Sequence, residues 1–147
     1  MFKILDEVCT PQRATKYSAY VDLFARESTI IGAGETKIVP LGVQIDIEEL
    51  KKSWVNKELG EDARESRKDL VDFWFDHFLK THYLELAIRS SLATKGLIIN
   101  NGKGVVDLDY QNEVGIILHN SNTESFTINK GDKVAQCTLI EHKGYLM

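Results

Sequence analysis

The run from Arg89 to Ala93 follows a stretch of alternating apolar residues and combines an arginine with two serines, Ser90 and Ser91. A guanidinium offers a planar fork of donors and a serine hydroxyl offers a compact donor, so these side chains can grip phosphate oxygens. A serine-capped turn before a short helix, with Arg89 in solvent, explains the same residues. Taken alone, the segment favours the turn.

Two aspartates follow an apolar pair in the segment from Gly104 to Tyr110. If this segment is extended, Asp107 and Asp109 project to the same face. An aspartate at the end of an apolar run can act as a general base that activates water. The alternative is a turn-forming pair between two strands, which is the default expectation for such a segment. A third segment, Gly131 to Gln136, is by itself only a tight turn that leads into a strand.

Two types of element must position these segments. Residues 1–47 and the chain from Tyr83 onward show period-2 patterns broken by turn residues, which predict short strands in a β-sandwich or barrel. Residues 48–82 are rich in charge and contain no proline, and they predict helices over about 48–58 and 66–81. In the longer helix two rows of apolar residues recur every four positions and form one stripe: Leu70, Trp74 and Phe78, and Val71, Phe75 and Leu79.

The composition is that of one small domain, and we expect residues 1–147 to form it. The chain has 147 residues, a net charge of −4 and 43% hydrophobic residues, which exclude a disordered or fibrous protein. No apolar run reaches the roughly 20 residues that span a bilayer, and the N-terminal residues lack the apolar stretch of a signal peptide. The acidic balance argues against a nucleic-acid polymer as partner. We therefore expect a cytoplasmic protein that does not bind membranes.

Together and in this order, the three polar segments resemble motifs two, three and four of the trimeric dUTPase family. Motif three is matched from Asn101 to Val114, and motif one resembles Ser18 to Leu23, with Tyr20 where the family has glycine. The resemblance covers residues 15–47 and 84–140, so residues 48–82 form a helical insertion between motifs one and two. It implies a mainly β fold, the dUTPase-like barrel or jelly roll, and a homotrimer with sites between subunits.

The resemblance also implies roles for individual residues. Asn101 would read the pyrimidine edge, with Gly104 letting the backbone approach the base, and Tyr110 would pack under the deoxyribose. Asp107 would deprotonate the water that attacks the α-phosphorus of dUTP, giving dUMP and pyrophosphate. The residues that hold the phosphates would be Arg89, Ser90, Ser91 and Gln136, with Asp22 in support. Mg2+ would be held mainly by the phosphates and water.

Two features depart from the family pattern. The family's fifth motif, a glycine-rich tail with an arginine and an aromatic residue, has no counterpart after Gln136, which predicts slower turnover or looser binding. The helical segment is a candidate substitute, because it contains Trp74 and several basic residues, among them Arg64. The favoured alternative is that its aromatic stripe packs on the barrel.

Two other functions compete with the hydrolase. A related deaminase shares the barrel, but Ile117 stands where that relative has a catalytic glutamate. The second is a nucleotide-binding or regulatory protein with weak or no catalysis that acts through a protein partner, with residues 48–82 as the contact. The insertion makes a phage or prophage origin plausible.

Overall fold

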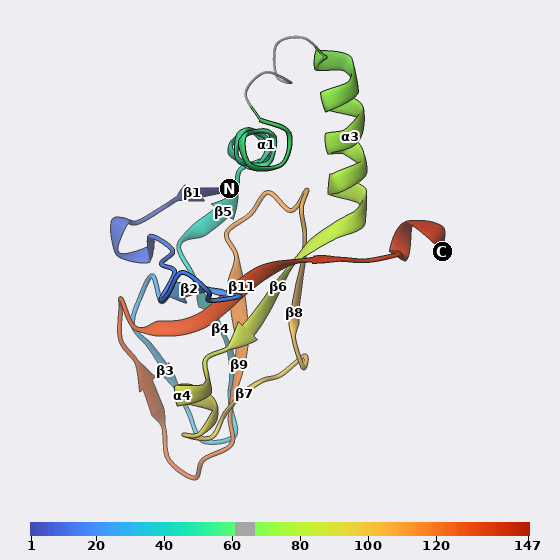
Figure 1. Ribbon diagram of the computed structural model, residues 1–147. Coiled ribbons are helices and arrows are strands. Elements are labelled where there is room, and N and C mark those ends of the chain that lie inside the picture. Colours follow the sequence, from blue (N-terminus) through green and yellow to red (C-terminus); the bar gives the residue numbers. More distant parts are fainter. Residues whose placement is uncertain (61–66) are drawn as a thin grey trace.

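A computed structural model describes residues 1–60 and 67–147 (Figure 1). Eleven strands are spread along this part of the chain: β1 Phe2–Ile4, β2 Val21–Phe24, β3 Thr29–Ile31, β4 Thr36–Pro40, β5 Val43–Ile45, β6 His82–Ile88, β7 Leu97–Ile99, β8 Gly104–Asp107, β9 Gly115–Asn120, β10 Phe126–Ile128 and β11 Lys133–Glu141. The predicted mainly β class is therefore confirmed.

The strands form four small antiparallel sheets. The largest has the order β2-β11-β6-β8, the second has the order β4-β9-β7, and two pairs, β1-β5 and β10-β3, complete the set. Strands that lie far apart in the chain are therefore neighbours, as Figure 1 shows for β11 beside β6 and β2. The sheets therefore hold the three polar segments, Arg89 to Ala93, Gly104 to Tyr110 and Gly131 to Gln136, in one folded unit.

One hydrophobic core connects these sheets. Alternate strand residues point into it, such as Leu84 and Leu86 of β6 and Ile116 and Leu118 of β9, each at most 1% exposed. Burial of such side chains stabilises the fold by about 1.5–3 kcal/mol for each. The residues between them face outward, which leaves the outer face of the β2-β11-β6-β8 sheet free to carry polar side chains.

The predicted helices lie between β5 and β6. Helix α1 spans Ile47–Trp54 and continues as one π-helical stretch, Val55–Leu59, and α3 spans Lys68–Thr81. Asp46 caps α1, because its carboxylate accepts a hydrogen bond from the Glu49 amide at 3.0 Å. In the described part of the chain, every helix is too short or too polar to cross a lipid bilayer.

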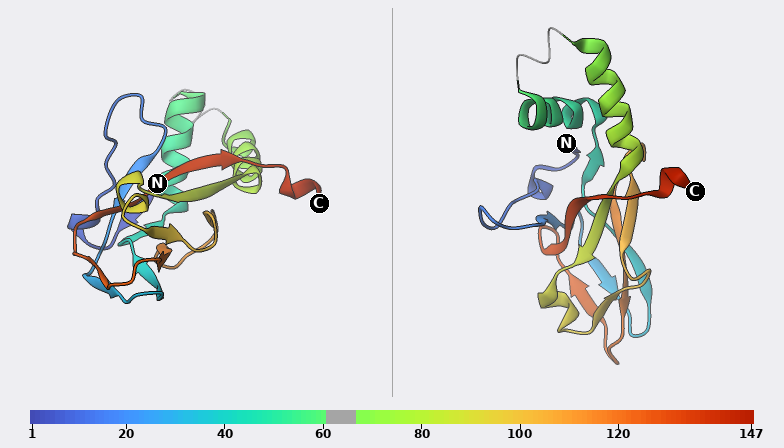
Figure 2. Two further views of the ribbon diagram at one scale, coloured as in Figure 1. Left: turned by 90° about the horizontal axis from the view of Figure 1, so that it is seen from below. Right: turned by 45° about the vertical axis from the view of Figure 1, so that its right-hand side comes forward.

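The two helices lie at one end of the β structure (Figure 2), and aromatic rings pack between them. The ring centroids of Trp54 lie 5.5 Å from Phe75 and 5.9 Å from Phe78. The predicted stripe is only partly correct, because Leu70 and Trp74 remain 43% and 41% exposed. A helix that rests on neighbours at one side exposes the opposite side, so Leu70 and Trp74 stay partly in solvent, whereas Phe78 of the same row packs on Trp54.

Candidate functional site

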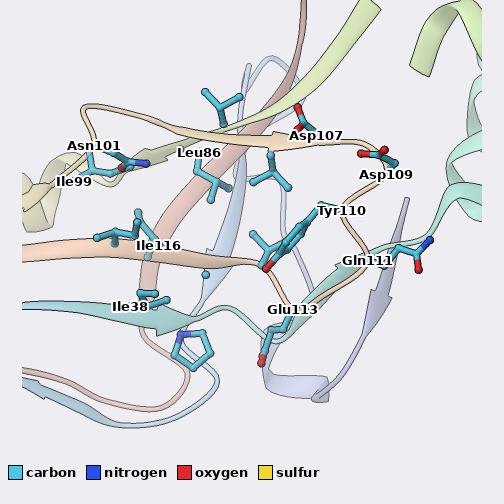
Figure 3. Close-up of a pocket in the computed structure, with 17 residues that line it drawn as sticks. Ile38, Leu86, Ile99, Asn101, Asp107, Asp109, Tyr110, Gln111, Glu113 and Ile116 are labelled. Carbon is cyan, nitrogen blue, oxygen red and sulfur yellow. The ribbon is translucent and has the colours of Figure 1, made fainter. Parts of the chain in front are cut away.

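The first candidate site is a pocket of about 690 Å3 beside the hairpin that leads from β8 toward β9, here called the hairpin pocket. Its lining includes four of the predicted site residues: Asn101, Gly104, Asp107 and Tyr110. Figure 3 shows the Tyr110 ring reaching into the middle of the pocket. The rest of the lining is mainly apolar, including Leu86, Ile99, Ile38, Pro40 and Ile116.

Local backbone chemistry positions the two predicted chemical groups of this pocket. Strand β8 ends at Asp107, and a turn closes with the Tyr110 amide donating to the Asp107 carbonyl at 3.0 Å. The condition of an extended chain from Val105 to Tyr110 is thus not met, because the strand stops at Asp107. The turn brings Asp107 and Tyr110 to the same pocket, and Leu108 between them is buried.

Two glycines shape this hairpin for different reasons. Gly102 has a φ of +77°, and its amide closes a turn by donating to the Ile99 carbonyl at 3.0 Å. Gly104 lies against the core, and a Cβ atom there would come within 2.7 Å of the Leu86 Cβ. The backbone of β8 therefore lies closer to β6 than any side chain at position 104 would allow.

Glu113 fixes the far wall of the hairpin pocket and was missed at the sequence level. Its two carboxylate oxygens each accept a hydrogen bond from Arg26 at 3.1 Å, and one also accepts from the Gly42 amide at 3.0 Å. No local pattern could reveal these contacts, because the partners lie 87 and 71 positions away in the chain.

The second candidate site is a smaller pocket of about 300 Å3, here called the ion-pair pocket. Three separate segments line it. The first contributes Tyr20 and Asp22, the second Arg89 and Ser90, and the third Gln136. The register explains this meeting, because Gln136 of β11 pairs with Asp22 of β2 on one side and Ala87 of β6 on the other. Ser91, also predicted to bind phosphate, lines neither pocket.

An ion pair dominates this pocket. Arg89 donates to Oδ1 of Asp22 at 2.5 Å, and the Asp22 side chain is 7% exposed. The expectation of a solvated Arg89 is therefore wrong, although Ser90–Ala93 does form the short helix α4. The second carboxylate oxygen of Asp22 is buried without a hydrogen-bond partner, 3.7 Å from the Lys133 amine. Arg89 is thus the cationic donor in the lining of this pocket, already paired with Asp22, and Ser90 and Gln136 add a hydroxyl and an amide.

Other expectations concern the helical segment and metal ligands. Trp74 lines none of the described pockets, and Arg64 lies outside the described residues. No group of three or more His, Cys, Asp or Glu side chains that could hold a metal ion occurs in residues 1–60 and 67–147.

Comparisons with known proteins show which family this chain resembles. A family model described as dUTPase matches residues 79–146, which run from the end of α3 past β11 and include the hairpin between β8 and β9. The deoxyuridine 5'-triphosphate nucleotidohydrolase of Rickettsia canadensis is 28% identical over 139 residues, covering 92% of this chain and 73% of its own. This chain is similar to dUTPases over most of its length.

More local and more distant similarities agree with this one. The enzyme of the same name from Kluyveromyces lactis is 54% identical over 57 residues, which are 39% of this chain and 38% of that protein. The crystal structure of a Streptococcus mutans dUTPase superposes with a TM-score of 0.68 at 23% identity, over 97% of this chain and 95% of that chain. A mutant dUTPase from phage phi11 of S. aureus, in a structure that shows a structural Mg(II) ion, gives 0.69 at 19% identity over 97% and 90%.

Proposed function

We propose that this chain hydrolyses dUTP to dUMP and pyrophosphate. The observation that carries the proposal is that Asp107 and Tyr110 both line one mainly apolar pocket, within a hairpin that the dUTPase family model covers. The relatives from Rickettsia and Kluyveromyces, which are named for this activity, support it. The proposal treats residues 1–147 as one dUTPase-like domain.

The hairpin pocket is proposed to take the nucleoside. Its apolar lining suits a pyrimidine and a deoxyribose, and the exposed Asn101 and the backbone beside Gly104 offer donors and acceptors to the base edge. Tyr110 reaches into this pocket, where its ring would pack against the sugar and occupy the space of a 2′-hydroxyl (Figure 3). The pocket would therefore select a deoxynucleotide.

Asp107 is proposed as the general base. Its carboxylate is exposed at the end of β8, where a water molecule can reach it. Asp107 takes a proton from this water while the water oxygen forms a bond to the α-phosphorus. The bond from the α-phosphorus to the oxygen that bridges to the β-phosphorus breaks, and its electron pair leaves on pyrophosphate.

The ion-pair pocket is proposed to take the phosphate chain. Arg89, Ser90 and Gln136 supply a guanidinium, a hydroxyl and an amide from three positions around one small space. These donors can hold the phosphates and stabilise the negative charge that develops on the leaving group. For Ser91, a contact with the phosphates is proposed only because it follows Ser90 in the chain.

The side chains of the ion-pair pocket fit a Mg2+ ion only if most of its ligands come from the bound substrate. Asp22 is the one carboxylate in the lining of the ion-pair pocket, and a single carboxylate cannot complete the six oxygen ligands that Mg2+ prefers. Phosphate oxygens and water would supply the rest, with Asp22 accepting from a water molecule. When bound, the ion would neutralise part of the triphosphate charge.

The two pockets of one chain are proposed to serve different active sites of a homotrimer. Asp107 pairs with Tyr83, and Gln136 pairs with Ala87 on the opposite edge of β6. Standard strand spacing then separates the Cα atoms of Asp107 and Gln136 by about 13 Å along β6 and about 10 Å across it. This gap, about 16 Å in all, is too wide for both side chains to act on one phosphoryl group, so each complete site needs a second copy.

A complementation experiment tests both the activity and the shared site. The wild-type protein should release pyrophosphate from dUTP in magnesium buffer, and Asp107→Asn and Arg89→Ala should each be nearly inactive. When the two variants are unfolded together and refolded as a mixture, sites that combine an intact Asp107 with an intact Arg89 from a neighbour should restore activity. Activity of the wild type without restoration in the mixture would contradict the shared site, and an inactive wild type that binds dUTP would contradict the hydrolysis itself.

A protein contact through residues 48–82 is a second proposal, and it is compatible with the first. Leu70, Phe73 and Trp74 form an exposed apolar row on α3, with Phe73 68% exposed, on the side that does not pack on α1. Nothing in the comparisons favours a protein without catalysis. The discriminating variant is Asp107→Asn, which should abolish hydrolysis but leave intact any biological activity that depends on a partner alone.

A further inference from the structure

Tyr20 lines the ion-pair pocket, and its hydroxyl reaches a carboxylate that lies outside the lining of that pocket. Its hydroxyl donates to Oε1 of Glu85 at 2.7 Å, although the two residues are 65 positions apart. The register explains the reach: Tyr20 precedes Val21, which pairs with Cys137, and the next residue of β11, Thr138, pairs with Glu85. The half-buried phenol therefore crosses β11 on the outer face of the sheet.

The Glu85 carboxylate makes several polar contacts besides the one with Tyr20. Tyr83 donates to its other carboxylate oxygen at 2.7 Å, and the Lys103 amine lies 3.4 Å away. The hydrogen bonds from Tyr83 and Tyr20 lower the pKa of Glu85 below its ordinary value. The side chain is 16% exposed and lines neither pocket, whereas Tyr20 lines the ion-pair pocket.

This arrangement matters for a pocket that takes an anion. A second negative charge a few ångströms away repels a phosphate chain, and the repulsion is strong where water is excluded. Here Lys103 partly neutralises Glu85 at one carboxylate oxygen, and the hydroxyl of Tyr20, which lines the pocket, donates to the other oxygen.

We propose that Tyr20 is a specificity-determining residue that masks Glu85 from an anionic ligand in the ion-pair pocket. Glu85 is its positioning partner, because it holds the ring in place through the hydroxyl. The inference rests on the assignment of this pocket to the phosphate chain. It gives a role to the residue that departs from the glycine of motif one: at this position a glycine would leave Glu85 facing the phosphates.

The test measures binding of inorganic tripolyphosphate in magnesium buffer by calorimetry to the full-length protein. Tyr20→Ala removes the mask and should weaken binding about ten-fold, and Tyr20→Phe, which loses only the hydroxyl, about two- to three-fold. The double variant Tyr20→Ala with Glu85→Gln removes the unmasked charge as well, and its affinity should return to within about three-fold of the wild type.

Two controls separate masking from general damage. Tyr83→Phe removes the other hydroxyl from the same carboxylate but lies outside the pocket lining, so tripolyphosphate affinity should stay within about two-fold. Deoxyuridine, a probe of the hairpin pocket, should bind all variants as it binds the wild type. Thermal melting confirms that each variant is folded.

Three results would overturn the inference: an unchanged affinity in Tyr20→Phe and Tyr20→Ala, no recovery in the double variant, or an equal loss in Tyr83→Phe. A wild-type protein that binds no tripolyphosphate overturns it together with the phosphate assignment. A wild type that binds tripolyphosphate but does not hydrolyse dUTP contradicts only the proposed catalysis, so the two failures are distinguishable.

Discussion

The two pockets differ in how the chain builds them. The hairpin pocket takes its proposed chemical groups, Asn101 to Tyr110, from one continuous segment that a glycine turn and a strand end hold in place. The ion-pair pocket takes its groups from three segments that only the register of β2, β11 and β6 brings together. The geometry of the hairpin pocket therefore depends on local backbone conformation, and that of the ion-pair pocket depends on the register of the sheet. Substitutions should therefore affect the two pockets in different ways.

The largest effect is expected at the hairpin pocket. Asp107→Asn removes the proposed base with almost no change in shape, so kcat should fall by about 100- to 10,000-fold. Affinity for deoxyuridine and for tripolyphosphate should be unchanged, because the substitution leaves the linings intact. Pyrophosphate release gives kcat and calorimetry gives the affinities. A kcat within ten-fold of the wild type would remove Asp107 from the chemistry.

In the ion-pair pocket we expect Arg89→Lys to weaken tripolyphosphate binding by about ten-fold. Lysine keeps the charge but loses the planar fork, so it cannot serve Asp22 and a phosphate together. Arg26→Lys is the matched control, because Arg26 also pairs with a carboxylate, that of Glu113, but does not line the ion-pair pocket. Equal losses in the two variants would show that the pocket has no special part in phosphate binding.

Gly104→Ala should destabilise the protein by about 1–3 kcal/mol. The new Cβ would meet the Leu86 Cβ at 2.7 Å in a packed core, where added atoms force the backbone to shift. Gly102→Ala is the comparison, because its Cβ meets nothing within 4 Å and only the positive φ opposes it, at a cost of about 1 kcal/mol. Urea unfolding gives both values. A larger loss in Gly102→Ala would show that the turn, rather than the close packing, sets the hairpin.

The smallest effect concerns acid stability of the region between the pockets. Because hydrogen bonds from Tyr83 and Tyr20 lower the pKa of Glu85 in the folded state, the stabilisation is complete above its ordinary value of 4.5. It is lost as the pH falls through the lowered pKa. The melting temperature of Glu85→Gln should therefore lie below that of the wild type at pH 7, and the difference should shrink below about pH 4.

Glu27→Gln, at an exposed position, should melt with the wild type at both pH values. A constant difference between the wild type and Glu85→Gln across this range would mean that Glu85 acts through packing and not through its charge.

The sequence by itself determined the β strands, the helices near 48–58 and 66–81, and the resemblance to dUTPases, because alternation, periodicity and short motifs are local properties of the chain. It also pointed to Asp107 and Tyr110, since both belong to one segment. The tertiary structure alone decided that Arg89 pairs with Asp22, that Glu113 anchors to Arg26 and Gly42, and that Tyr20 lies over Glu85. These contacts join residues 65 to 87 positions apart, and their distances are fixed by strand register, which no window of neighbouring residues contains.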